Sequence, residues 1–104
     1  KNPTLLDTRA FLLIRAGRFD EAIQMINLAE ELPVDRESLR WSLAVHLAWA
    51  YQGKGQIEKA RDAFQRAEAR GFRLDSSNVL ERPFLAKLRQ DLGLGAEPAP
   101  SPSG

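Results

Sequence analysis

The feature that most constrains this chain is a repeat with a period of 38 residues. When the sequence is shifted by 38 places, "AGRFDEAI" (16–23) lies over "KGQIEKAR" (54–61). Small residues coincide in this alignment: Ala10 with Ala48, Gly17 with Gly55, Ala22 with Ala60, and Ala29 with Ala67. Small side chains let two helices approach closely, and glycine turns the chain between them. The repeat therefore predicts one helical hairpin that is used twice.

Periodicity and end signals predict five helices and no strand. Asn2 is a candidate N-cap before Pro3 at the first helical position, Gly17 and Gly71 are stops, and Asp35 can cap the third helix. The predicted helices lie at about 4–16, 19–32, 36–52, 56–70 and 81–92. On the third helix, Leu43 and Leu47 form a stripe expected against the fourth, while Val45 and Trp49 belong to a second stripe.

The two units resemble the tetratricopeptide repeat family, whose motif sets small and aromatic residues at fixed spacings. The second unit carries the motif as Leu47, Ala48, Tyr51, Gly55, Ala60, Phe64 and Ala67. The first carries Leu6, Ala10, Leu13, Gly17, Ala22, Ile26, Ala29 and Pro33, with Arg9 where leucine is usual. The family's usual period is 34 residues, so about four extra residues fall at the Pro33 turn and in a longer third helix.

The resemblance implies an all-α fold, an α-solenoid of two tetratricopeptide-like helix-turn-helix units plus a C-terminal capping helix. The expected domain spans 1–94, with units at about 3–34 and 36–72 and the cap at 81–92. Two units are fewer than such arrays usually need for stability, so we expect the C-terminal end of a longer array. The start near Leu5 and Leu6 would then be an exposed face, through which the chain could self-associate.

The resemblance also implies a binding surface, because the first helix of each unit lines the concave side in this family. The candidate partner-binding residues are Asp7, Phe11, Ile14, Arg15, Ser42, Val45, His46, Trp49 and Gln52. An extended or helical protein segment with apolar anchors is the expected ligand. An alternative stays open, since aromatic residues at helical spacing are also typical of a core, and Phe11 would then pack on Trp49 between the units.

The sequence offers no constellation for chemistry, so we expect no enzyme, cofactor or metal. The chain has no cysteine and a single histidine, His46, which has no acidic partner on its own helix face. The serines lack a base, and Asp20 with Glu21 suits the positive end of a helix.

Charge and hydropathy exclude further classes. The 15 basic and 14 acidic residues give a net charge of +1, so there is no general attraction to nucleic acid. The second half is mildly basic, and a nucleic-acid-binding helical module is the alternative function. It rests on Lys59, Arg61, Arg66, Arg70, Arg73, Arg82, Lys87 and Arg89, which are interleaved with acids.

No apolar run is long enough for a spanning helix, so we expect a soluble chain without membrane insertion, with the cytoplasm as the favoured compartment. The chain begins at Lys1 without methionine, and we expect it to be an excerpt of a longer protein. Residues 95–104, "GAEPAPSPSG", are expected to form a disordered tail or linker.

Overall fold

A computed structural model describes residues 2–98 of the chain, and within them the fold is all-helical without strands. Five α-helices follow one another: α1 (Pro3–Arg15), α2 (Phe19–Glu30), α3 (Glu37–Gly53), α4 (Ile57–Ala69) and α5 (Arg82–Asp91). A short 3-10 helix, η1 (Leu74–Ser76), precedes α5. All five predicted helices are thus present, with ends that differ from the expected ones by one or two residues.

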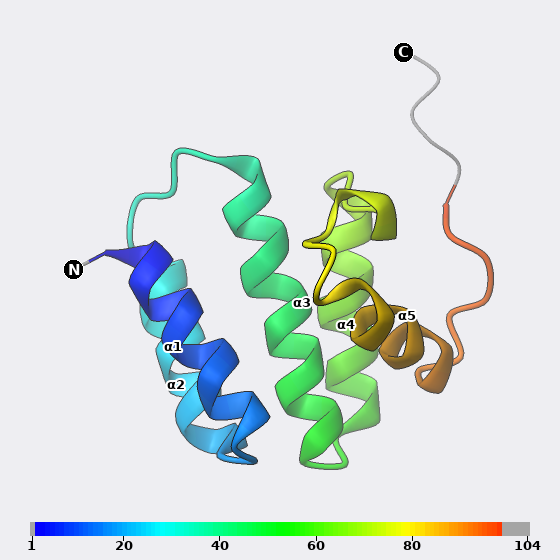
Figure 1. Ribbon diagram of the computed structural model, residues 1–104, viewed down its shortest axis with the longest axis horizontal. Helices are drawn as coiled ribbons and strands as arrows, with labels where there is room; N and C mark the ends of the chain where they lie inside the picture. The colour runs from blue at the N-terminus through cyan, green and yellow to red at the C-terminus, as the bar shows by residue number, and fades with distance from the viewer. Residues whose placement is uncertain (1, 99–104) are drawn as a thin grey trace.

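The four long helices form two antiparallel hairpins that lie side by side, and α5 runs across the second of them (Figure 1). Helix α3 is central, because it packs against α1, α2, α4 and α5. It is also the longest helix, at 17 residues, which accounts for part of the 38-residue period.

The two hairpin turns are built identically, as the repeat predicts. Gly17 and Gly55 both have a φ of +79°, which a residue with a Cβ rarely adopts. The amide after each glycine donates back into its helix, from Arg18 to the Leu13 carbonyl at 2.8 Å and from Gln56 to the Tyr51 carbonyl at 2.9 Å. These are the bonds of a glycine-terminated helix, which satisfy carbonyls that the helix leaves unpaired.

The caps agree with expectation at one helix and differ at another. The Asn2 side chain accepts a hydrogen bond from the Thr4 amide at 2.8 Å, so the predicted cap of α1 is confirmed. The predicted cap by Asp35 is wrong: α3 begins later, its N-cap is Arg36, and no side chain bonds its first amides. Arg36 instead donates to the Thr4 hydroxyl at 3.0 Å, which ties this loop to α1.

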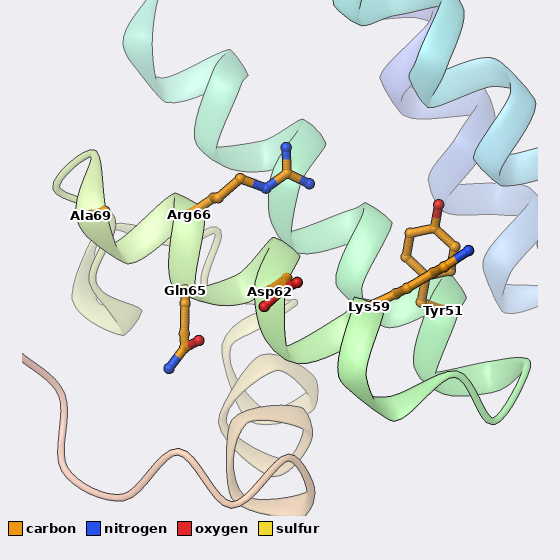
Figure 2. Close-up of a pocket in the computed structure, with 6 residues that line it drawn as sticks. All are labelled: Tyr51, Lys59, Asp62, Gln65, Arg66 and Ala69. Atoms are coloured by element: carbon orange, nitrogen blue, oxygen red, sulfur yellow. The ribbon is translucent and has the colours of Figure 1, made fainter.

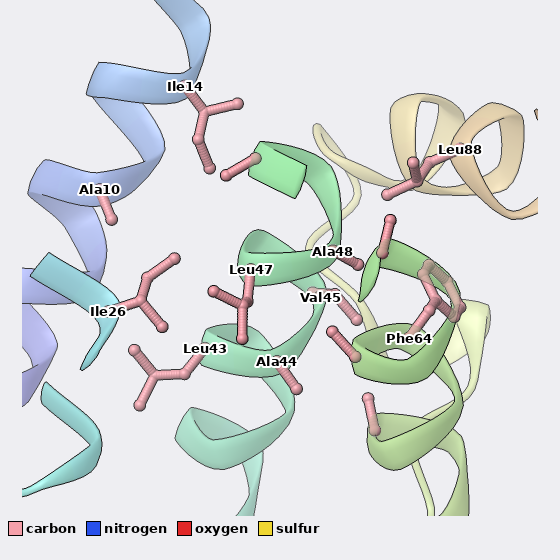
Figure 3. Close-up of a cluster of buried hydrophobic side chains, with 14 of the residues drawn as sticks. Ala10, Ile14, Ile26, Leu43, Ala44, Val45, Leu47, Ala48, Phe64 and Leu88 are labelled. Carbon is pink, nitrogen blue, oxygen red and sulfur yellow. The ribbon is translucent and has the colours of Figure 1, made fainter. Parts of the chain in front are cut away.

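The repeated alanines lie where the helices pack. Ala10, Ala22 and Ala29 of the first hairpin and Ala48, Ala60 and Ala67 of the second are all fully buried. Since a methyl group is the whole side chain, the helix axes can approach while Ile26 and Phe64 fill the spaces between them (Figure 3).

One packing expectation is wrong. Leu43 and Leu47 point toward Ile26 of α2, and the small residues Ala44 and Ala48 lie on the side of Phe64 of α4 (Figure 3). The large side chains of α3 therefore fill the space between the hairpins, because the small ones are needed for close contact within its own hairpin.

A glycine also sets the distance between the hairpins. A Cβ on Gly53, at the end of α3, would lie 2.4 Å from the ring of Phe19 at the start of α2. Phe19 is partly buried against the core, and its ring occupies the space that a side chain at position 53 would need.

The expected tail is only partly described, because residues 99–104 lie outside the described part of the chain. The Gly95 and Ala96 carbonyls accept hydrogen bonds from the Arg89 guanidinium. The Glu97 carboxylate accepts from the Leu74 amide at 2.7 Å. Up to Glu97, the chain is therefore held against α5 and η1.

Replacing Ala60 by leucine tests the packing of the hairpins. The extra volume has no space between α3 and α4, so we expect a loss of about 1–3 kcal/mol in the free energy of unfolding. Ala69→Leu on the exposed side of the same helix is the matched control, with little change. Urea unfolding measures both, and equal stability of the two variants would contradict this packing.

Candidate functional site

The nine predicted surface residues lie on α1 and α3, and α5 covers part of them. Asp7, Ile14, Val45 and His46 are buried; Phe11, Ser42, Trp49 and Gln52 are partly exposed; Arg15 is exposed. Several of them contact one another or α5 directly, so this face is already occupied in part by the chain's own last helix.

His46 is the centre of this face. Its Nδ1 lies 2.7 Å from Asp7 Oδ1 on α1, and its Nε2 lies 2.7 Å from Glu81 Oε1 at the start of α5. The Ser42 hydroxyl donates to the other Asp7 oxygen at 2.6 Å. His46 is 2% exposed and Asp7 7% exposed, so these bonds form away from solvent. One side chain thus joins three helices.

A charged ring matches this geometry. A neutral imidazole has one N–H donor and one acceptor, whereas both partners here are carboxylates that accept. Burial lowers the pKa of His46, but the hydrogen bonds and charges of Asp7 and Glu81 outweigh it and raise the pKa from 6.5 to about 9. The ring is therefore an imidazolium at neutral pH.

A row of rings continues from His46 to the rim of the face. The Phe11 ring lies 5.5 Å from the His46 ring and meets Trp49 edge-on at 5.9 Å. Trp49 stacks on Phe84 of α5 at 5.8 Å, and the Arg15 guanidinium lies 4.9 Å above the Phe84 ring. Aromatic and cation–π contacts of this kind add to burial. Phe11 and Trp49 do pack together between the units.

The row ends at an open groove. It has a volume of about 310 Å³ and is lined by Trp49, Gln52, Phe84, Lys87, Leu88 and Asp91. Phe84 remains 44% exposed there. The groove therefore offers an apolar floor with a cation and an anion at its rim.

A second buried ion pair holds the far end of α5. The Arg89 Nε donates to Glu68 Oε2 at 2.6 Å, and both side chains are at most 7% exposed. The Arg61 Nε donates to the Leu92 carbonyl at 3.1 Å, just past the end of α5. Helix α5 is thus bound by charge at both ends and by apolar contacts between them.

Sequence reasoning missed Glu68, Glu81, Phe84 and Arg89 as members of this site. His46 was expected to lack an acid because only its own helix face was considered. Its two carboxylates come from 39 and 35 residues away, on other helices. No spacing rule within one helix could have found them.

A cleft lined by Ser42, Glu81 and Leu85, among others, belongs to the same site, whereas the charged side chains of a further hollow are all exposed. A shallow depression on the outer side of α3 and α4 is lined by Tyr51, Lys59, Asp62, Gln65, Arg66 and Ala69 (Figure 2). Its charged side chains are of both signs, and no buried polar group points into it. Over residues 2–98 no group of three acidic, histidine or cysteine side chains is arranged to hold a metal ion.

Comparisons of the chain with protein-family models, with curated proteins and with solved structures find no match. Among the described residues, no helix has the length and apolar character to cross a membrane. The site is therefore interpreted from its own geometry.

The charged ring predicts a pH dependence of stability. Because the folded pKa is raised, the contribution of His46 is complete below about pH 6.5 and is lost as the pH rises through about 9. This difference corresponds to about 3 kcal/mol. Urea unfolding at pH 6 and pH 9.5 should show that the wild-type chain loses about this much more than His46→Gln. Equal losses in the two proteins would contradict the imidazolium bridge.

Proposed function

We propose that this chain is a protein-interaction scaffold, built from two tetratricopeptide-like units, that holds a peptide or protein segment on the face formed by α1 and α3. The observation that carries this proposal is the row of rings from Phe11 to Phe84, which ends beside Trp49 in an open groove with an apolar floor and polar side chains at its rim. Partly exposed aromatic side chains next to a groove are typical anchors for a partner.

The groove also indicates the chemistry of the ligand. Its floor of Trp49, Phe84 and Leu88 suits an aromatic or aliphatic side chain, and Lys87 and Asp91 at the rim suit polar groups on either side. An extended or helical segment with one or two apolar anchors fits this arrangement. The chain binds such a segment by shape and apolar contact and performs no reaction on it.

The nucleic-acid alternative has less support. Arg89 is buried against Glu68, Arg82 donates to the carbonyls of Leu74, Asp75 and Ser77, and Arg61 pairs with Glu58 at 2.5 Å. Lys87 pairs with Asp91 at 3.1 Å. Part of the positive charge of the second half is therefore paired within the chain, in the interior at Arg89 and at the surface at Arg61 and Lys87, and less of it is available to phosphates.

A displayed library of 15-residue peptides selected on the wild-type chain tests the scaffold. We expect the selected peptides to carry apolar anchors and to bind Trp49→Ala at least tenfold more weakly, as measured by fluorescence polarisation. Leu12→Ala is the control, because Leu12 is 61% exposed on α1 and outside the groove. Circular dichroism identifies conditions in which both variants are folded, and Gln52→Arg, which obstructs the groove, replaces Trp49→Ala if that variant unfolds. Unchanged affinity for the groove variants would rule out this face.

The N-terminal hairpin carries a second apolar surface that supports the proposed self-association. Leu5 is 67% and Leu28 43% exposed. They line a groove of about 290 Å³ with Asn2, Leu6, Arg9 and Met25. This is the face of the first unit on which a preceding helix would stack in a longer array.

Light scattering across a range of concentrations tests this contact. We expect the wild-type chain to associate at high concentration and Leu5→Ser to shift the equilibrium toward monomer, since the change removes apolar area from an exposed site. Leu80→Ser, at a residue 81% exposed near α5, is the control and should leave the association unchanged. A monomeric wild-type chain at every concentration contradicts the proposal.

A further inference from the structure

Helix α5 is bound to the rest of the chain as a peptide ligand would be. Glu81 meets His46 at one end, Phe84 stacks on Trp49, Leu85 lines a small cleft with Val45 and Phe72, and Arg89 meets Glu68 at the other end. These contacts define a sequence pattern along α5. A carboxylate (Glu81) is followed by an aromatic residue three places later, by leucines four and seven places later, and by an arginine eight places later. These spacings place them within reach of one face of a helix.

We propose that α5 is a built-in competitor, displaced when a partner helix that carries the same pattern binds to the surface of α1, α3 and α4 that α5 covers. This inference rests on the proposed scaffold function and names a ligand for the surface beneath α5, so its binding removes the part of the open groove that Phe84, Leu88 and Asp91 of α5 line. The ligand is an amphipathic helix with an acidic residue near its start, apolar residues three, four and seven places later and a cation at the eighth. We take the pattern of the partner from α5 because α5 is the helix that already occupies this surface.

The charges make this recognition selective. If α5 leaves, His46 keeps Asp7 but loses Glu81, and Glu68 loses Arg89, in a site with little solvent, which is unfavourable for both side chains. A competing helix that brings a carboxylate and a cation at the right spacing restores both pairs, whereas a merely apolar helix restores neither. The two ion pairs therefore select by sequence among helices that the apolar contacts alone would accept.

The attachment of α5 permits exchange. It is a helix of only 10 residues, too short to be stable alone in water, so its structure depends on docking. The segment before it is solvent-facing, with Val79 71% and Leu80 81% exposed. The packed alanines and the Ile26 and Phe64 side chains, by contrast, belong to the two hairpins. Undocking α5 exposes Leu85 and Leu88, which are buried in the docked state, but it removes none of the contacts between these hairpin side chains.

The test uses a fluorescent peptide of residues 78–94 added to the full chain. In the wild-type protein the tethered α5 competes at an effective concentration of about the millimolar range. In the Leu85→Ala chain this competitor is weakened, so the peptide should bind at least tenfold more tightly than to the wild type. If circular dichroism shows that this chain is unfolded, Glu81→Gln serves instead. Equal binding to wild type and variant, or no binding to the variant, overturns the proposal.

Changes in the peptide check the pattern. On the same variant chain, the peptide with its own Glu81→Gln or Leu85→Ala should bind at least tenfold more weakly. The Gln90→Ala peptide is the control, because Gln90 is exposed on α5, and should bind as the parent peptide does. If Glu81→Gln in the peptide has no effect, the acidic element of the proposed ligand is wrong.

Displacement itself is measured by a distance within the chain. Since the sequence has no cysteine, Gln24→Cys on α2 and Gln90→Cys on α5 are the only positions that a nitroxide label would modify. Saturating peptide should replace the single distance by a broad distribution, and an unchanged distance overturns displacement. If library peptides bind while this distance stays unchanged, the scaffold stands and the competitor role of α5 is wrong. If the α5 peptide binds but no library peptide does, helix docking stands and the open groove is not a binding site.

Discussion

The arrangement of the site depends on one interaction, the bridge from Asp7 through the His46 imidazolium to Glu81. It spans α1, α3 and α5 with two bonds of 2.7 Å in a buried position. A buried charge is tolerated only where partners compensate for lost hydration. Here the compensation comes from helices that are distant in sequence, so the charge of His46 and the docking of α5 require each other. A substitution that weakens the docking of α5 therefore also changes the protonation of His46, and the reverse holds as well.

The hairpins and the site use different kinds of side chain. Within each hairpin, alanines bring the helices together, and Leu43 fills the space between the hairpins; these side chains are nearly inaccessible to solvent. On the face of α1 and α3, aromatic and charged side chains such as His46 and Trp49 join aliphatic ones such as Val45. They contact α5, which is short and crosses the second hairpin (Figure 1). The closely packed hairpins thus form a rigid framework, and α5 is an exchangeable helix on it. The proposed scaffold needs this arrangement.

Much of the fold was predictable from the sequence because its determinants are local or repeated. Gly17 and Gly55 mark turns that the chain forms identically, and Ala22 and Ala60 recur because helix packing imposes the same requirement twice. The direction of the leucines on α3 was predicted wrongly, since a single sequence does not show which apolar stripe of α3 packs against α2 and which packs against α4. The site was predictable only in its α1 and α3 part. Glu81 and Arg89 join it through the path of the chain after α4, and that path has no periodic signal.

The protonation of His46 is the most direct test of this account, and the measurement is unambiguous because the chain contains one histidine. Nitrogen-15 NMR of the imidazole ring at pH 7 should show protons on both nitrogens, protected from solvent exchange by Asp7 and Glu81. In Glu81→Gln the Nε2 proton should lose its carboxylate acceptor and exchange faster with solvent, while the Nδ1 proton keeps its bond to Asp7. A ring that is neutral at pH 7, with one protonated nitrogen and a titration near the ordinary value of 6.5, would contradict the bridge and the docking of α5 that depends on it.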